Sequence, residues 1–448
     1  MSKANTSQPP PAADWSSERA ERQLRSLELF GMRFGLDRMR RMMTVLGSPE
    51  RHFDAIHVLG TNGKSSTTRM IAAILARHGL HTGAYLSPHL SSYTERIQIA
   101  EQNIAEDEFA IAVARATWAS ERVNRTLAEN DHVTQFELLT AAAYWELHRR
   151  GVDVAVVEAG LGGRYDATSV IDASVTVLTN VGLEHTRWLG PTVTDIAREK
   201  LAVLRDGHTL AIGADLDPRV LSVVAELARE RDALVLQTPS EAEGHGAKPL
   251  ALGARGAFQR RNFALARVAA EAYLRRIAVK PSEHAIRESA RVTAVDGRFQ
   301  VAARDPLVIL DGAHNPHAVR ALVDSLDEIP GGWPDGGRPL GLVLGVLEDK
   351  DAASMLRALL PICARVWFTA PASSRALSPA ALQSLAGQLG FEASVCEPAP
   401  AKALSAAREW ARAQGPDAVV LASGSIYLVG ELLRITEAGD PPHRHQEG

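Results

Sequence analysis

Apolar residues recur along this chain in two patterns, as short unbroken runs and as runs at helical spacing. The first strand-like run, which is rich in apolar residues, covers residues 53–59, and apolar residues at helical spacing follow it at positions 70, 71, 74 and 75. From residue 297 onward the alternation repeats, with strand-like runs at 307–310, 342–344, 366–369 and 419–421. Strands that alternate with helices form parallel sheets covered by helices on both faces, so the pattern predicts an α/β protein.

The turn between the first strand and its helix contains Gly60, Thr61, Asn62, Gly63, Lys64, Ser65 and Ser66. A glycine-containing loop before a helix presents backbone N–H groups to an anion, and the helix dipole adds to the attraction. Lys64 can reach outer phosphates, and a serine hydroxyl after it suits Mg²⁺. Val58 stands where the general phosphate-loop pattern has glycine, so an ordinary turn is the alternative. The strand before and the helix after favour nucleotide binding.

Polar residues stand directly after several predicted strands, where open parallel sheets bind their ligands. Glu158 follows the apolar run 154–157, and a carboxylate there is costly unless it is paired or binds a metal. Ser87, His185 and Asp311 stand in similar places. A simple turn at Ser87 and a structural role for His185 are the alternatives. We expect a ligand site at these strand ends.

A glycine-rich loop follows Glu158, and its polar members are Arg164 and Asp166. The glycines allow a ligand to approach the backbone closely. We interpret Arg164 and Asp166 as ligand-binding residues, with a surface salt bridge as the alternative. Thr134 and Phe136 stand at the start of a predicted helix earlier in the chain, where Thr134 can act as a cap while Phe136 faces a ligand. A purely capping role for this segment is the alternative.

The helix that begins after Thr192 carries a lysine in an unusual place. Lys200 falls on its apolar stripe, four residues after Ile196 and one before Leu201. A lysine directed inward needs a partner or a changed charge state, and a lysine that snorkels at the edge of the stripe is the alternative. Reaction with carbon dioxide to a carbamate is one chemical solution, because it places an oxygen anion near Mg²⁺.

Length and composition set the broad class. A chain of 448 residues is too long for one core, which predicts two domains. A net charge of −4 gives no support for nucleic-acid binding, and no apolar run is long enough to span a membrane. Two widely separated cysteines, Cys363 and Cys396, fit a reducing cytoplasm. The polar ends, residues 1–18 and 439–448, are predicted to be disordered tails.

These motifs, in this order, resemble those of folylpolyglutamate synthase/dihydrofolate synthase, a branch of the Mur ligase superfamily. The resemblance runs from about residue 27 to 433 and includes a phosphate loop that lacks the earlier glycine. It also covers the segment around Lys200, where the family carries a carbamylated lysine, and the run 311–316. It implies a P-loop ATPase domain with a parallel central sheet at 19–297. A smaller Rossmann-like C-terminal α/β domain follows at 298–438.

The resemblance also implies roles for individual residues. ATP would be bound by Gly60, Thr61, Asn62, Gly63, Lys64, Ser65, Ser66, Asn262, Arg298 and Asp311. Two Mg²⁺ ions would be held by Ser87, Glu158, His185 and carbamylated Lys200. The substrate pocket would include Thr134, Phe136, Arg164, Asp166 and Ser423. The catalytic residues would be Lys64, Lys200, Arg298 and His314.

The expected function is therefore an ATP-dependent carboxylate–amine ligase that adds L-glutamate through an acyl phosphate. The acceptor would be dihydropteroate, a reduced folate, or both. A Mur-type ligase acting on a cell-wall precursor is the alternative within this enzyme class, and a nucleotide-binding regulator is the alternative outside it. The expected partners are small molecules, and the enzyme is expected to be a cytoplasmic monomer.

Overall fold

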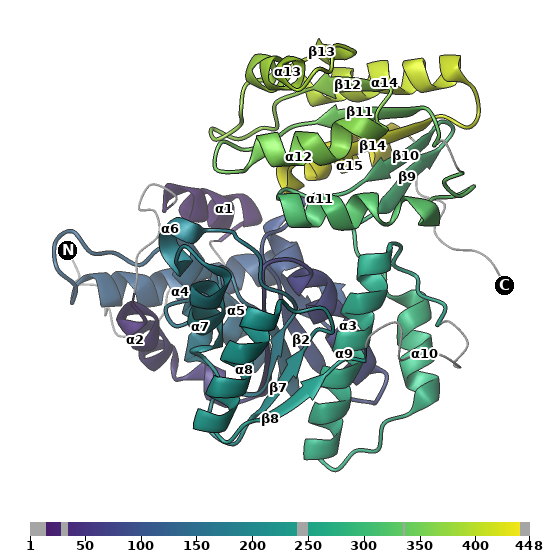
Figure 1. Cartoon of the computed structure of the whole chain (residues 1–448). Coiled ribbons are helices and arrows are strands. Elements are labelled where there is room, and N and C mark those ends of the chain that lie inside the picture. The colour runs from purple at the N-terminus through teal and green to yellow at the C-terminus, as the bar shows by residue number, and fades with distance from the viewer. Residues whose placement is uncertain (1–14, 28–34, 240–249, 335–336, 440–448) are drawn as a thin grey trace, which may run out of the picture. The chain divides into compact units, whose positions relative to one another are not determined.

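The computed structural model describes residues 15–27, 35–239, 250–334 and 337–439. The chain divides into two compact units (Figure 1). The first contains residues up to 251 together with 261–293, and the second contains 252–260 and the chain from 294 onward. The sequence predicted one boundary at 297/298, whereas the chain passes between the units three times. The two-domain α/β fold is confirmed.

The first unit is built on an eight-stranded sheet in the order β4-β3-β2-β5-β1-β6-β7-β8. Only the β2–β3 and β3–β4 pairs are antiparallel. Its strands are β1 (Asp54–Leu59), β2 (Thr82–Tyr85), β3 (Ile97–Ile99), β4 (Gln102–Asn103), β5 (Val154–Glu158), β6 (Ala173–Leu178), β7 (Thr209–Ile212) and β8 (Leu234–Gln237). All but the first residue of β1 are buried, as its largely apolar sequence predicted.

Helices of the first unit pack on this sheet and on one another. They are α1 (Ser17–Ser26), α2 (Asp37–Leu46), α3 (Lys64–Ala76), α4 (Glu106–Asn124), α5 (Gln135–Arg149), α6 (Thr186–Leu189), α7 (Val193–Leu201), α8 (Pro218–Glu230) and α10 (Glu283–Val292). Helix α9 (Ala257–Arg276) begins in the second unit and continues in the first. Helices α5 and α7 begin at the predicted capping residues, because the Thr134 and Thr192 side chains accept backbone N–H groups.

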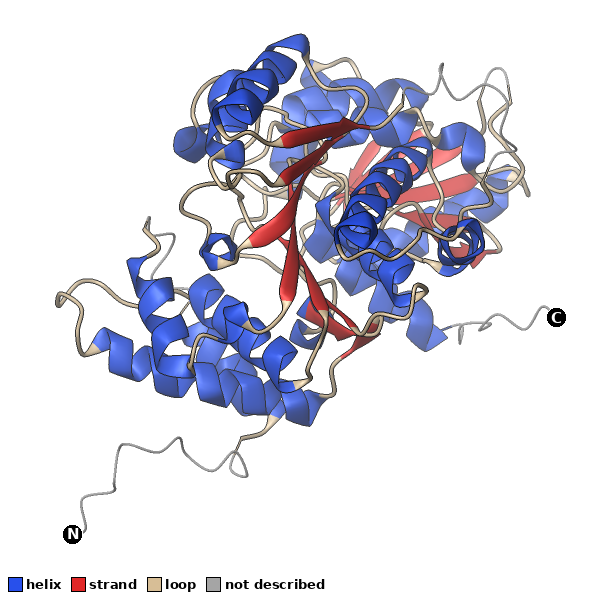
Figure 2. Cartoon of the chain, turned by 90° about the horizontal axis from the view of Figure 1, so that it is seen from below, coloured by secondary structure: helices blue, strands red, loops and turns tan. Residues whose placement is uncertain are grey.

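The second unit contains a six-stranded sheet in the order β13-β12-β11-β14-β10-β9, in which only β9 is antiparallel. Its strands are β9 (Gln300–Arg304), β10 (Leu307–Leu310), β11 (Leu340–Leu344), β12 (Arg365–Phe368), β13 (Ser394–Cys396) and β14 (Val419–Ser423). Its helices are α11 (Pro316–Val323), α12 (Ala352–Leu359), α13 (Pro379–Gln388), α14 (Pro400–Gln414) and α15 (Ile426–Gly439). Both sheets lie between helices (Figure 2).

The predicted tails lie largely outside the described residues. At the far end Gly439 is the last residue of α15, and at the start Ser17 and Glu18 belong to the first turn of α1 rather than to a tail. The Ser16 side chain accepts the Arg19 backbone N–H and so caps this helix, a local interaction that composition alone does not indicate.

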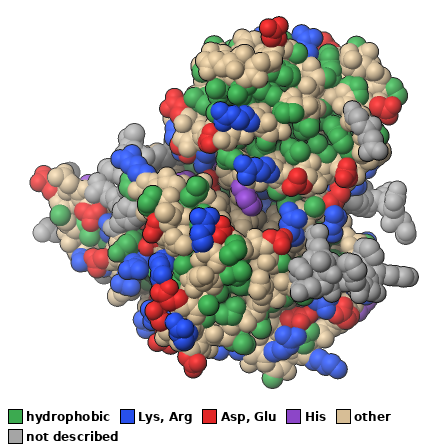
Figure 3. All heavy atoms as spheres, viewed as in Figure 1, with side chains coloured by type: hydrophobic (Ala, Val, Ile, Leu, Met, Phe, Trp, Pro, Cys, Tyr) green, Lys and Arg blue, Asp and Glu red, His purple; other side chains and the backbone are tan. Residues whose placement is uncertain are grey.

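The net charge and the apolar runs of the sequence led to predictions about the surface charges and the helices of the described residues. On the face that Figure 3 shows, acidic and basic side chains are interspersed. Among the described helices, none has the length and the apolar character that crossing a membrane requires.

Candidate functional site

Three loops meet at one edge of the first unit's sheet. Strand β1 pairs in parallel with β5, where Val58 lies opposite Glu158, and with β6, where Leu59 lies opposite Leu178. The phosphate loop, the glycine-rich loop and the segment after β6 therefore all leave the sheet at the carboxyl ends of neighbouring strands. This is where parallel α/β sheets bind ligands.

The phosphate loop is held by residues that follow β6. The Thr179 hydroxyl donates to the Asn62 carbonyl at 2.6 Å, and the Asn180 side chain both donates to that carbonyl and accepts the Asn62 N–H. Gly63 has a φ of 80°, and a Cβ added there would lie 2.4 Å from Asn262 Oδ1. Asn262 thus lies against the loop, as expected for a nucleotide-binding residue. Sequence reasoning assigned no role to Thr179 and Asn180, since their contacts with the loop depend on strand pairing.

The first turn of α3 carries the charged and hydroxyl groups of the phosphate loop. Helix α3 begins at Lys64, whose Nζ donates to the Thr61 carbonyl at 3.2 Å. Ser65 Oγ donates to Glu158 Oε1 at 2.8 Å, and Ser66 is buried. The loop therefore presents its helix N-terminus, one ammonium group and one carboxylate-bound hydroxyl, a combination suited to phosphate and a divalent cation.

Glu158 is the carboxylate at the centre of this edge. Its side chain is 1% exposed, and its second oxygen accepts the Ser87 backbone N–H at 2.9 Å. Two predicted metal ligands, Ser87 and Glu158, are thus brought together through the Ser87 main chain. His185 occupies the position before the short helix α6 at a positive φ, without a capping bond from its side chain, and its Nε2 lies 3.8 Å from Glu184 Oε1. The described residues contain no group of three or more His, Cys, Asp or Glu side chains placed to hold a metal ion.

Lys200 joins two of the loops. Its side chain is 3% exposed, and Nζ donates to the carbonyls of Gly60 at 3.0 Å and Leu161 at 2.7 Å. Burial, together with the nearby Lys64 charge, lowers the pKa of Lys200 to about 7. The inward orientation expected from the helix pattern is therefore observed, and the snorkelling alternative is wrong.

Asp166 shapes the glycine-rich loop from within. Its Oδ2 accepts the Gly162 N–H at 2.8 Å, and its Oδ1 accepts both the N–H and the hydroxyl of Thr168. Arg164 points elsewhere, with its side chain 60% exposed and its Nε 3.9 Å from Glu199 Oε2. The two polar residues of the loop thus point to different places: Asp166 is directed into the loop, and Arg164 lies at the surface near Glu199.

A buried histidine that sequence reasoning missed lies behind Asp166. His57, on β1, is 1% exposed, and its Nε2 lies 2.9 Å from Thr168 Oγ1. Since the Thr168 hydroxyl donates its proton to Asp166, His57 must donate through Nε2–H. Burial lowers the pKa of His57 to about 4, so the ring is neutral at physiological pH. The apolar run around His57 concealed it from sequence reasoning.

The start of α5 faces the same loop. The Thr134 hydroxyl is used within the capping box, since it accepts the Glu137 N–H at 3.3 Å and donates to Glu137 Oε2 at 3.0 Å. Phe136 is directed to the glycine-rich loop, where a Cβ added at Gly160 would lie 2.6 Å from its ring. Thr134 therefore caps the helix, and the Phe136 ring lies against the loop that Asp166 holds.

In the second unit, predicted site residues gather after β10 and β14. Asp311 accepts the backbone N–H groups of Phe299 and Ala313, each at 2.8 Å, and burial raises its pKa. His314 Nδ1 donates to the Gly312 carbonyl at 2.8 Å, and Ser423 Oγ donates to the Ala313 carbonyl at 3.3 Å. The turn that carries Arg298 is joined to the same loop, since Gly312 N–H donates to the Gly297 carbonyl at 2.9 Å.

Known proteins match both parts of the chain. The Mur ligase middle domain family matches residues 58–232, and the Mur ligase glutamate ligase domain family matches 297–426. A dihydrofolate synthase/folylpolyglutamate synthase of Escherichia coli is 32% identical over 96% of this chain and 96% of its own length. A Mycobacterium tuberculosis folylpolyglutamate synthase complexed with ADP has a TM-score of 0.86 at 29% identity and covers 96% of this chain and 99% of its own.

A longer relative also matches. The Haloferax volcanii protein named as a probable bifunctional folylpolyglutamate synthase/dihydropteroate synthase is 35% identical over 94% of this chain. The chain spans 50% of that protein's length. The matched region is therefore one part of the haloarchaeal protein and nearly the whole of the bacterial one.

Proposed function

The chain belongs to the folylpolyglutamate synthase/dihydrofolate synthase family of Mur ligases, and on that basis we propose that it is an ATP-dependent ligase adding L-glutamate to dihydropteroate, to reduced folate, or to both. The observation that carries the proposal is the contact between Ser65 Oγ and Glu158 Oε1 at 2.8 Å. It places a hydroxyl and a buried carboxylate beside the N-terminus of α3, where a nucleotide's phosphates and their cation would bind.

A divalent cation fits the donor set at this place. Ser65, Ser87 and Glu158 offer hydroxyl and carboxylate oxygens, the ligands that Mg²⁺ prefers. We propose that these residues hold the ion, with His185 completing its coordination. When bound, Mg²⁺ would neutralise charge on the phosphate oxygens. Glu158 also orients the Ser65 hydroxyl and fixes the Ser87 main chain.

Lys200 is proposed to be carbamylated and to support a second Mg²⁺ ion. With a pKa of about 7, a substantial fraction of its amines is neutral at physiological pH and can attack carbon dioxide. The Nζ–carbon bond forms as one proton leaves, so an anion replaces the cation. A carbamate retains one N–H, and Lys200 would then keep only one of its two carbonyl contacts, with Gly60 or with Leu161.

The proposed reaction has two transfers. An oxygen of the acceptor carboxylate attacks the γ-phosphorus, and the bond between that phosphorus and the ADP oxygen breaks. The amine of glutamate then attacks the acyl carbon, which releases phosphate and a proton. Lys64 and the N–H groups of the phosphate loop would stabilise the transferred charge. We assign Arg298, Asp311 and Asn262 to the nucleotide and His314 to the phosphoryl-transfer step.

We further propose that Phe136 and Asp166 bind the pterin. Phe136 offers an aromatic face, and Asp166 Oδ2 is a carboxylate oxygen at the same loop. Arg164, Thr134 and Ser423 complete the proposed substrate set. The enzyme would work on these small molecules as a cytoplasmic monomer, and sedimentation of the purified protein tests its oligomeric state.

The deciding experiment measures ADP release from MgATP and glutamate with dihydropteroate or tetrahydrofolate as the acceptor. Turnover with dihydropteroate establishes the synthase activity, and turnover with tetrahydrofolate establishes chain extension. Lys64→Ala should abolish both activities, while Lys280→Ala, at an exposed lysine of the same unit, should abolish neither. Turnover with neither acceptor, by a folded protein that binds ATP, would overturn the proposal. A nucleotide-linked cell-wall precursor would then be tried as the acceptor.

A further inference from the structure

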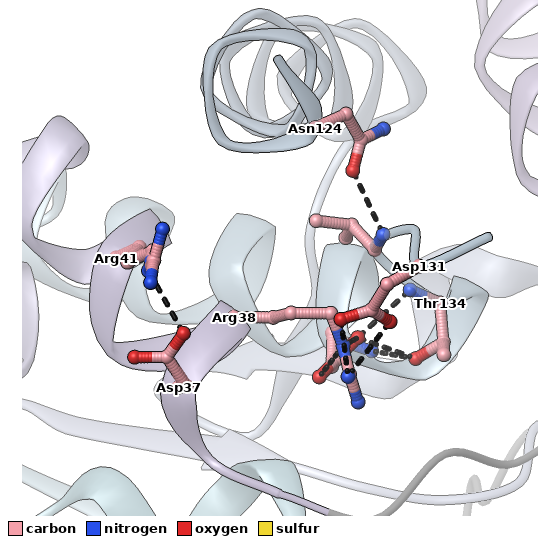
Figure 4. A network of polar contacts seen from close by, with 8 residues as sticks. Asp37, Arg38, Arg41, Asn124, Asp131 and Thr134 are labelled. Carbon is pink, nitrogen blue, oxygen red and sulfur yellow. Dashed lines mark hydrogen bonds and ion pairs between the residues drawn. The ribbon is translucent and has the colours of Figure 1, made fainter. Parts of the chain in front are cut away.

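A buried cluster of charges lies at the start of α5 (Figure 4). Arg38, on α2, is 6% exposed, and its Nε donates to Glu137 Oε1 at 3.0 Å and Oε2 at 3.1 Å. Its Nη1 donates to Asp131 Oδ1 at 3.0 Å. One guanidinium therefore fastens two acidic residues that lie on either side of the turn into α5.

The turn itself is tied down by the same carboxylate. Glu137 Oε2 also accepts the Thr134 N–H at 2.8 Å and the Thr134 hydroxyl at 3.0 Å. The Val133 N–H donates to Asn124 Oδ1 on α4 at 2.9 Å. The segment 131–137 is thus attached to α2 and to α4, and Glu137 joins the helix cap to the ion cluster.

Stability alone does not account for this cluster. Arg38 and Glu137 are both buried, and nearby residues on their helices, Met39, Met42 and Leu138, belong to the unit's hydrophobic core. Removing two charges from water costs about as much free energy as their attraction returns, and apolar replacements are often equally stable. A buried ion cluster with several fixed bonds instead specifies one position for the chain that carries it.

The position that it specifies is that of Phe136. This residue directly precedes Glu137, and its ring lies against Gly160, where an added Cβ would be 2.6 Å from the ring and 3.2 Å from Asp166 Oδ2. The Phe136 carbonyl accepts the Thr140 hydroxyl at 2.8 Å, which fixes the residue from the helix side. The aromatic ring and the carboxylate oxygen therefore converge on one point of the glycine-rich loop.

We propose that Arg38 is a positioning residue for the acceptor substrate. It holds the 131–137 turn so that Phe136 presents its ring beside Asp166 to a flat heterocycle with N–H donors. Arg38 acts through Glu137 and does not touch the substrate. This inference rests on the proposed function and deepens it, because it names a determinant of acceptor binding outside the residues that the family motifs indicate.

The test uses Arg38→Met, Glu137→Gln and the double variant Arg38→Met/Glu137→Gln, assayed for the Michaelis constants of dihydropteroate, ATP and glutamate. Arg38→Met leaves Glu137 buried without its cation and should lower the melting temperature. The double variant removes both charges and should recover much of that loss. Arg38→Met and the double variant should each raise the Michaelis constant for dihydropteroate about tenfold and leave those for ATP and glutamate within about twofold. Arg38→Lys keeps a cation at this position, and it should raise the Michaelis constant for dihydropteroate less than Arg38→Met does.

Arg41→Met is the matched control. Arg41 lies on the same helix but is half-exposed and pairs with Asp37 at 2.8 Å, so all three constants should stay unchanged (Figure 4). Recovery of dihydropteroate binding in the double variant would show that Arg38 only neutralises Glu137, which overturns the inference. Equal changes in all three constants would also overturn it. A wild-type enzyme that neither binds nor uses dihydropteroate or tetrahydrofolate would overturn the proposed function first.

Discussion

Lys200 Nζ donates to the main-chain oxygen of Leu161 at 2.7 Å. The contact joins a helix that begins at Thr192 to the glycine-rich loop after β5, and a second bond joins the same nitrogen to Gly60 in the phosphate loop. One buried lysine therefore holds two loops together by hydrogen bonds. A change in its charge would alter its bonds to both loops.

The charge state of Lys200 should appear in the stability of the protein. Its pKa falls from 10.5 to about 7 on folding, so between these values the unfolded chain binds the proton and the folded chain does not. Stability should therefore rise with pH over this window, by at most about 1.4 kcal/mol per pH unit, relative to Lys200→Met. Urea denaturation at pH 7 and pH 9 measures the difference. Parallel stability curves would contradict the lowered pKa.

Carbamylation of Lys200 predicts a dependence on carbon dioxide. Enzyme freed of carbon dioxide should lose activity and regain it on addition of bicarbonate, because the carbamate forms reversibly on the neutral amine. Lys200→Ala should lower kcat at least about a hundredfold and should not respond to bicarbonate. Incorporation of isotope-labelled bicarbonate, followed by NMR, checks the modification itself. Activity that is insensitive to bicarbonate would contradict it.

Glu158 and Ser87 should differ in how they affect magnesium. Glu158→Gln puts an amide beside the Ser65 hydroxyl and removes the negative charge, and it should lower kcat by about a hundredfold or more. Ser87→Ala keeps the main-chain bond to Glu158 but removes the proposed hydroxyl ligand. It should raise the Mg²⁺ concentration that gives half-maximal activity. An unchanged magnesium dependence would show that only the Ser87 main chain matters.

A methyl group at Gly160 should weaken acceptor binding selectively. The new Cβ would lie 2.6 Å from the Phe136 ring, so the ring must move away from the loop. Gly160→Ala should raise the Michaelis constant for dihydropteroate about tenfold and leave that for ATP unchanged. Gly387→Ala is the control, since a Cβ there meets no neighbour within 4 Å. If Gly160→Ala behaves like this control, Phe136 does not contact the acceptor.

Thr168 makes one hydrogen bond with His57 and another with Asp166, and two small substitutions at Thr168 should therefore differ in stability and in acceptor binding. Thr168→Val has nearly the same shape but no hydroxyl, so His57 Nε2–H and Asp166 Oδ1 each lose a partner. We expect a loss of about 1–3 kcal/mol in the free energy of unfolding and weaker acceptor binding. Thr168→Ser keeps the hydroxyl and should remain close to wild type. Chemical denaturation and acceptor titration measure both effects. Equal results for the two variants would show that the Thr168 hydroxyl does not support this arrangement.

Much of the fold could be read from the sequence because its causes are local. Largely apolar runs indicated buried strands such as β1 and β5, and capping residues Thr134 and Thr192 marked where α5 and α7 begin. Helical periodicity placed Lys200 on the apolar stripe, and the structure decided between an inward side chain and one that snorkels. The family could be indicated from the sequence because the phosphate loop, the strand-end residues and the segment around Lys200 follow one another in the family's order.

Only the tertiary structure decided which groups meet. Ser65 and Glu158 are 93 positions apart, His57 and Thr168 are 111 apart, and Lys200 lies 140 positions from Gly60. These contacts depend on the register of parallel strands and on the packing of helices against them, and no local pattern encodes either. For the same reason the sequence assigned Arg164 and Asp166 alike to ligand binding, whereas the folded loop turns Asp166 inward to its own backbone and leaves Arg164 exposed.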